Sequence, residues 1–197
     1  GVGHHMVGGR NNTVSGSYYG ITSGRHNLAP FEFGYGLQIG HSGSTRNKIH
    51  GAISTAAGAF AAKGDAQLTS HVVYRGQTTN NTATVIYNAA DASNKWTLAA
   101  NDSVLVKATV IGRKVGDAGQ SAAYEVICAF KNQGGTSSAG TTGVTKRVLN
   151  EDTGTTNYDA TLAVNNTDDT FELKVTGDTG HTVNWMAHVE VLKLNIA

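Results

Sequence analysis

Side chains that could carry out catalysis are few in this sequence, and their spacing matches no catalytic signature. Carboxylates are adjacent only at Glu151-Asp152 and Asp168-Asp169, in turn-like stretches where such groups are usually solvated. Glycoside hydrolysis needs two carboxyl groups about 5–9.5 Å apart, and in the N-terminal region Glu32 and Asp65 are far apart in sequence. The chain also has no phosphate-binding glycine loop, no HExxH and no GxSxG. We therefore predict that the protein is not an enzyme and has no catalytic residues.

Histidine and cysteine are the remaining candidates for chemistry, as metal ligands or as a nucleophile. The histidines match no zinc signature, and an exposed His4-His5 pair is a simpler interpretation than a metal bound on an oligomer axis. The single cysteine, Cys128, lies in AAYEVICAF without a base or positive charge beside it. We predict that Cys128 is a small buried side chain on a strand, and that the protein has no metal and no cofactor.

The composition favours a β-rich extracellular or virion protein. Charged residues make up only 15% of the chain, apolar residues reach 39%, and glycine occurs 25 times in 197 residues. The net charge of +1 argues against a nucleic-acid partner, which usually needs a basic surface. No stretch approaches the ~18 apolar residues of a membrane span, so we expect no membrane insertion.

The N-terminal third contains imperfect repeats that predict a stacked β-coil or β-roll. Gly9, Gly24, Gly40 and Gly58 align at steps of 15, 16 and 18 residues, and such a near-constant step is typical of repeat architectures. Glycine adopts the positive φ that tight corners need. Each copy has few apolar residues, so we expect the coils to stack on one another and to pack against two other copies of the chain.

Aromatic residues in this region are the best candidates for ligand binding. They could carry sugar-binding surfaces into solvent, or they could pack against a neighbouring coil or chain, which we favour. The candidate ligand-binding residues are Tyr18, Tyr19, Phe31, Phe33 and Tyr35.

The sequence after Gln67 predicts an antiparallel, jelly-roll-like β-sandwich. Short alternating segments are separated by turn residues, and Trp96 and Trp185 are expected in the core. We place the domain boundary between a coil at 1–67 and a sandwich at 68–197. The predicted strands are His71–Arg75, Thr84–Tyr87, Trp96–Leu98, Val104–Val115, Ala122–Lys131, Thr145–Leu149, Ala160–Val164, Phe171–Val175 and Val183–Leu194.

Several short motifs spread over nearly the whole chain carry a resemblance to a known family. They are KGDAQ (Lys63–Gln67), VVYRGQTT (Val72–Thr79), LAANDSVLVKATVIGR (Leu98–Arg113), AAYEVICAF (Ala122–Phe130), VTKRVLNED (Val144–Asp152) and GDTGHTVNWMAHVEV (Gly177–Val191). Together with the glycine–asparagine repeats before them, they resemble the distal, receptor-binding end of phage tail fibre and tailspike proteins. The repeats also resemble the heads of trimeric bacterial adhesins.

The resemblance implies a homotrimer in the extracellular part of the virion that recognises a bacterial surface. Its expected partners are a surface glycan or an outer-membrane protein, and other tail or fibre proteins. Because no catalytic signature is present, we expect attachment without enzymatic activity. Two alternatives stay open: a purely structural cap that trimerises the fibre, and a fragment of a polysaccharide-depolymerising tailspike.

Overall fold

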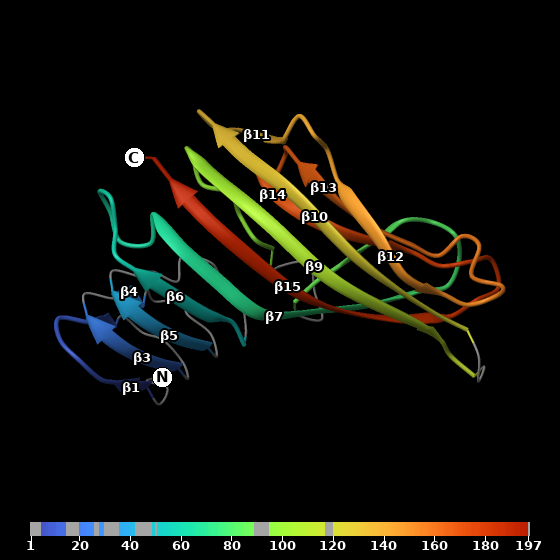
Figure 1. Ribbon diagram of the computed structural model, residues 1–197, viewed down its shortest axis with the longest axis horizontal. Coiled ribbons are helices and arrows are strands. Elements are labelled where there is room, and N and C mark those ends of the chain that lie inside the picture. Colours follow the sequence, from blue (N-terminus) through green and yellow to red (C-terminus); the bar gives the residue numbers. More distant parts are fainter. Residues whose placement is uncertain are drawn as a thin grey trace.

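The described part of the chain is all-β, as predicted. The computed structural model describes residues 5–14, 20–25, 28–29, 36–41, 49, 51–88, 95–116 and 120–196. These residues form strands, turns and bends, and among them no helix is long and apolar enough to cross a membrane. Figure 1 shows an elongated molecule with short N-terminal strands at one end and long strands running to the other.

The N-terminal segments stack with parallel strands. One sheet contains β1 (His5–Val7), β3 (Gly20–Arg25), β5 (Gly36–His41) and β6 (Ile53–Ala57), each parallel to the next. The shorter β2 (Thr13–Val14) and β4 (Leu28–Ala29) pair in a separate parallel sheet. Among the residues from β1 to the end of β6 whose burial is described, the buried ones are Thr22, Ile49, Ala52 and Ser54. Only two of these four are apolar, so the described residues of the coil bury few apolar side chains.

A column of close backbone contacts determines where glycine is required in this coil. Gly24 and Gly40 lie side by side with φ of 115° and 112°, and Gly40 pairs in turn with Ala56. A Cβ at Gly24 would overlap the carbonyl of Gly40, and a Cβ at Gly40 would overlap that of Ala56. The prediction that Gly58 is the fourth equivalent position of the repeat, after Gly9, Gly24 and Gly40, is therefore wrong. Ala56 occupies that position, and a Cβ at Gly58 would contact nothing within 4 Å.

A hairpin at residues 58–65 reverses the chain and joins the parallel strands to the antiparallel ones. The Asp65 carboxylate accepts hydrogen bonds from the backbone N–H groups of Phe60 (3.0 Å), Ala61 (2.7 Å) and Ala62 (2.8 Å). Burial alone would raise the pKa of Asp65, but these N–H groups hold the pKa below its ordinary value. The predicted domain boundary at 67/68 falls inside the next strand, β7, so the two-domain division stays a prediction.

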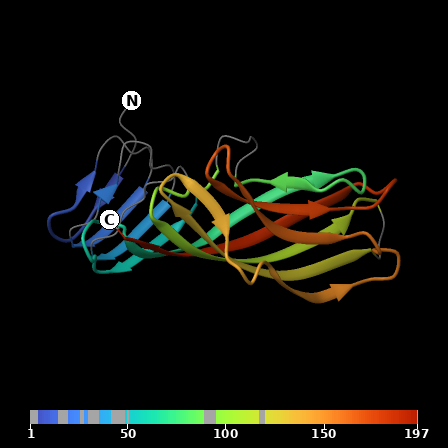
Figure 2. The ribbon, with the colours of Figure 1, turned by 90° about the horizontal axis from the view of Figure 1, so that it is seen from above.

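Four strands of 13 residues continue the same sheet. After β6 the order is β7 (Ala66–Thr78), β15 (Val183–Asn195), β9 (Asp102–Lys114) and β10 (Ser121–Gln133), all antiparallel. β11 (Thr136–Ala139) and β12 (Thr145–Glu151) both pair with β10. A three-stranded sheet, β13 (Asp159–Asn165), β14 (Thr170–Thr176) and β8 (Thr84–Ile86), forms the second layer. Figure 2 shows these layers from above.

The core lies between the long-stranded sheet and the three-stranded sheet. Burial alternates along β9 and β15, so every second side chain points inward. Trp185 is opposite Gly76 on β7 and Gly112 on β9, and a Cβ at Gly112 would overlap the indole ring. The indole N–H of Trp185 donates to Thr78 Oγ1 at 2.9 Å. The expectation of a buried Trp185 is confirmed.

A second aromatic cluster also lies in the core. The ring of Phe171 on β14 stacks on Trp96 at 6.2 Å between centroids and on Phe130 of β10 at 5.9 Å. The contact between Phe171 and Phe130 joins the two layers, because Phe171 belongs to the smaller sheet and Phe130 to the long-stranded one. The expectation that Trp96 is a core residue is also confirmed.

Eight of the nine predicted strands of the sandwich are present with shifted ends. Trp96–Leu98 is wrong, because this segment forms a single bridge, Thr97 to Thr170, and no strand. The short edge strand β11 escaped prediction, since TSSA has neither apolar alternation nor bulky β-formers. Nothing in the sheet order tests the jelly-roll arrangement or the trimer, so these stay predictions.

The glycine column can be tested by one substitution with a matched control. We expect Gly24→Ala to lower the free energy of unfolding by about 2 kcal/mol or more, because the methyl group meets backbone and the φ is unfavourable. Gly58→Ala should change it little. Urea unfolding at one fixed protein concentration measures both changes. Equal midpoints for the two variants would contradict the claim that the close backbone contacts require glycine at position 24.

The Asp65 hairpin makes a pH-dependent prediction. The folded-state pKa is lowered, so the stabilisation is present above the unfolded-state value near 3.9 and is lost as the pH falls through the folded-state value. Asp65→Asn should lower the melting temperature at pH 7, because hydrogen bonds to a charged acceptor contribute about 1.5–3 kcal/mol. The difference between variant and wild type should shrink below about pH 4. A constant difference from pH 7 to pH 3 would contradict this role.

Candidate functional site

The outer face of the long-stranded sheet carries apolar side chains that no other described element covers. The register puts Leu68 of β7, Leu192 of β15, Leu105 of β9 and Ala129 of β10 in one row across four strands. Leu192 is 55% exposed, Leu105 44% and Leu68 37%. Contiguous exposed apolar surface of this kind marks interaction sites in soluble proteins.

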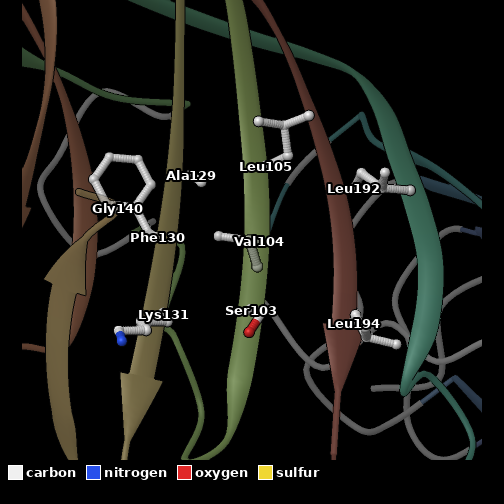
Figure 3. Close-up of a pocket in the computed structure, with 9 residues that line it drawn as sticks. All are labelled: Ser103, Val104, Leu105, Ala129, Phe130, Lys131, Gly140, Leu192 and Leu194. Carbon is white, nitrogen blue, oxygen red and sulfur yellow. The ribbon is translucent and has the colours of Figure 1, made fainter. Parts of the chain in front are cut away.

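A groove of about 370 Å³ lies over this row. Leu105 and Ala129 line it together with Leu192 and Leu194, and Lys131 supplies a charge at its margin. Figure 3 shows Leu192 and Leu194 on one strand, Leu105 beside them on β9, and Ala129 with Lys131 on β10. Val104 and Phe130, which are themselves buried, also line it.

A second groove of about 610 Å³ extends the same surface onto the coil. It shares Leu192 and Leu194 with the first groove and adds Ile39 of β5, Ala57 of β6 and Leu68 of β7. We call the set Ile39, Leu68, Leu105, Leu192 and Leu194 the apolar strip. Because the strip crosses from the parallel strands to the antiparallel ones, one partner surface could cover both parts of the molecule.

Charged residues border the strip toward the other end of the long strands. Lys107 Nζ lies 2.8 Å from the carboxylate of Glu125, and Arg147 lies 3.9 Å from it. The hydrogen bond between Lys107 and Glu125 raises the pKa of Lys107 and lowers that of Glu125. Interfaces commonly combine an apolar centre with a polar rim, and this face has both.

A pair of histidines lies beside these charges. The rings of His71 and His188 meet edge to face with centroids 5.5 Å apart, and Ser70 Oγ lies 2.8 Å from His71 Nδ1. Glu190 is on the same strand as His188 and opposite Lys107. Among the residues the structure describes, no three histidine, cysteine or acidic side chains are grouped closely enough to hold a metal ion.

The aromatic residues predicted to bind ligand lie outside the described residues. This applies to Tyr18, Tyr19, Phe31, Phe33 and Tyr35, and to His4 of the histidine pair. Cys128 is described, and it is buried on β10 as predicted. Burial raises the pKa of its thiol, which keeps it protonated.

The paired carboxylates, expected to be merely solvated, have structural roles. Asp152 accepts hydrogen bonds from the hydroxyl (2.7 Å) and backbone N–H (2.9 Å) of Ser121, which lower its pKa. Glu151 accepts a hydrogen bond from the hydroxyl of Tyr124 at 2.8 Å. Glu151 thereby joins the edge strand β12 to β10, and Asp152 joins the turn after β12 to the same strand.

The second carboxylate pair fixes a turn in the smaller sheet. Asp168 forms an ion pair with Lys95, and Asp169 accepts a hydrogen bond from the hydroxyl of Ser137 at 2.7 Å. Asp169 also has a positive φ of 51°. These contacts join the turn between β13 and β14 to two other parts of the sandwich.

Sequence reasoning missed the apolar strip because its members are far apart in the chain. The alternation in Val104–Val110 separates the two faces of the strand, but apolar residues occur on both of them. A single strand therefore does not reveal which leucines lie side by side. Which leucines lie side by side follows only from the cross-strand register, and the register was not predicted.

Comparisons with known proteins give partial structural similarity. No protein-family model and no curated protein sequence matches this chain. The crystal structure of the tailspike protein gp49 from Acinetobacter baumannii bacteriophage Fri1, a capsular polysaccharide depolymerase, is 10% identical with a TM-score of 0.33. That similarity covers 98% of this chain and 40% of that one.

Two other tailspike structures are similar to a comparable extent. The tailspike protein of Acinetobacter baumannii phage AM24 is 9% identical with a TM-score of 0.33, covering 90% of this chain and 34% of that one. The tailspike protein of Acinetobacter phage vB_ApiP_P1 is 10% identical with a TM-score of 0.28, covering 97% and 47%. The chain spans less than half the length of each structure.

One prediction from the sequence is corrected by these comparisons. We predicted that the protein is not an enzyme, whereas the Fri1 tailspike protein is a depolymerase of capsular polysaccharide. The absence of enzymatic activity is therefore not carried into the function proposed below.

Proposed function

We propose that the protein is the receptor-binding end of a phage tail fibre or tailspike, a homotrimer that attaches the virion to a bacterial surface glycan. The apolar strip is the observation that carries this proposal. It extends over the coil and the sandwich on one face, and three copies around a common axis would each cover the strip of a neighbour. The short motifs quoted from the sequence, from Lys63 to Val191, point the same way.

The few apolar side chains buried among the described residues of the coil support the same assembly. Its described buried residues include Thr22 and Ser54, and Ile39 is 42% exposed on the outer side. Stacked coils gain stability from each neighbouring surface they bury. Packing two sister coils against this one would add apolar burial that the single chain does not provide.

Trimerisation would also serve attachment directly. Three identical sites on one rigid axis bind a repeating surface polymer with an avidity far above that of one site. Proteins of the outer membrane and other tail or fibre proteins are the further partners in this proposal, and the virion is its location. The function proposed here is that of a phage tail protein, the class to which the tailspike proteins named above belong.

A charge placed in the apolar strip tests assembly and attachment together. Leu192→Lys should convert the trimer to monomer and reduce binding to bacterial surface polysaccharide by about tenfold or more, because avidity is lost. Light scattering and binding to immobilised capsular and O-chain polysaccharides measure the two effects.

Val115→Lys is the matched control, since Val115 is 50% exposed and lies beyond the end of β9, outside the strip. It should leave both mass and binding unchanged. An unchanged mass for Leu192→Lys would contradict the role of the strip. A wild-type trimer that binds no polysaccharide would favour the structural cap, and new reducing ends or unsaturated sugars would identify depolymerisation.

A further inference from the structure

A pocket of about 550 Å³ lies at the end of the long strands remote from the coil. β7 contributes Arg75 and Gln77 to its wall, β8 contributes Thr84 and Val85, and Tyr87 and Asn184 complete it. Unlike the grooves over the apolar strip, its lining is both polar and apolar. This mixture is typical of sites that bind small polar ligands with an apolar side.

Close contact between β7 and β8 gives the pocket a fixed shape. The backbone N–H of Arg75 donates to the carbonyl of Tyr87 at 2.9 Å, and the N–H of Tyr87 donates to the carbonyl of Arg75 at 3.4 Å. Gly76 permits this approach, because a Cβ there would overlap the side chain of Ile86. The side chains on either side of Gly76, those of Arg75 and Gln77, are exposed beside the pocket.

The polar groups of the pocket are positioned but retain hydrogen-bonding capacity. The side-chain amide of Gln77 donates to that of Asn184 at 2.8 Å. Among the described residues, the second oxygen and the second nitrogen of this pair have no other hydrogen-bond partner, so one acceptor and one donor can meet a ligand, and this holds if both amides are flipped. Paired amides with one open donor and one open acceptor suit the vicinal hydroxyl groups of a sugar.

Arg75 gives the pocket its charge. Its guanidinium has no carboxylate partner within the described ranges, and none of the residues lining the pocket is acidic. Arginine binds carboxylates through two parallel hydrogen bonds. Tyr87 and Val85 offer an apolar surface to the face of a sugar ring.

We infer that this pocket binds an acidic sugar residue of a surface polysaccharide. Arg75 binds the carboxylate, the Gln77–Asn184 pair binds hydroxyl groups, and Tyr87 packs against the ring. The inference rests on the proposed function and names a site and a ligand class for it. The pocket lies about eight residues along β15 from Leu192, or roughly 26 Å, so assembly through the apolar strip leaves it open.

Nuclear magnetic resonance provides a local readout, because the chain has two tryptophans. Both indoles are buried, but Trp185 also lines the pocket, whereas Trp96 packs against Phe171 and is not among the residues that line it. Titration with tetrasaccharides containing glucuronate or galacturonate should shift the indole N–H signal of Trp185 and leave that of Trp96 in place. The carboxyl-reduced, neutral forms of the same tetrasaccharides should bind at least about tenfold more weakly, and inorganic phosphate alone should not reproduce the shift.

Two variants that each remove one positive charge complete the test. Arg75→Gln should weaken binding of the acidic tetrasaccharides by about tenfold or more, while Lys146→Gln, on β12 where Lys146 pairs with Asp159, should bind as wild type does. Equal binding by Arg75→Gln and wild type, equal binding of acidic and neutral sugars, or no shift at Trp185 would each overturn the inference.

The test separates this inference from the proposed function. Wild-type protein that binds whole polysaccharide while Arg75→Gln binds it equally well would refute the pocket and leave attachment intact. Protein that binds the acidic tetrasaccharides through Arg75 but forms no trimer and attaches to no bacterial polysaccharide would refute the attachment proposal and retain the pocket.

Discussion

One continuous sheet runs through both the coil and the sandwich, and the described chain covers only one of its faces in the sandwich. Backbone pairing runs unbroken from β1 to β11, through the switch from parallel to antiparallel strands at β6 and β7. The three-stranded sheet covers the inner face, where the aromatic clusters around Phe171 and Trp185 pack. The outer face keeps a row of leucines in contact with solvent, and removing such surface from water is worth roughly 25 cal/mol per Å². The proposed assembly follows from this asymmetry.

The coil and the sandwich pack their strands in different ways. In the coil, glycine lets neighbouring turns approach closely, so the parallel strands pair in regular register, and few of the described side chains there are apolar and buried. In the sandwich, 13-residue strands present a buried side chain at every second position. The Asp65 hairpin connects the coil to the sandwich. The backbone carbonyl of Asp65 accepts a hydrogen bond from the N–H of Asn195, at the end of β15. The start of β7 is therefore fixed to the end of β15.

Sequence patterns predicted most of the fold, because strand alternation and turn residues are local signals. The strand at Val104–Val115 and the buried Trp185 were found this way. Failures occurred where the deciding contact is non-local: Gly58 fits the repeat by spacing, but the close approach involves Ala56. The candidate site was not predicted, because Leu68, Leu105 and Leu192 become neighbours only through register. The same holds for the pocket of Arg75 and Asn184, which are separated by more than half the chain.

The mass of the wild-type chain in solution tests the central claim most directly. Sedimentation velocity over a range of dilutions reports mass without altering any residue. The account predicts a single species of three chains that persists on dilution, because each copy buries apolar surface on both the coil and the sandwich. A single species of about 20.5 kDa, folded and stable at every concentration, would show that the outer face needs no partner and would contradict the account.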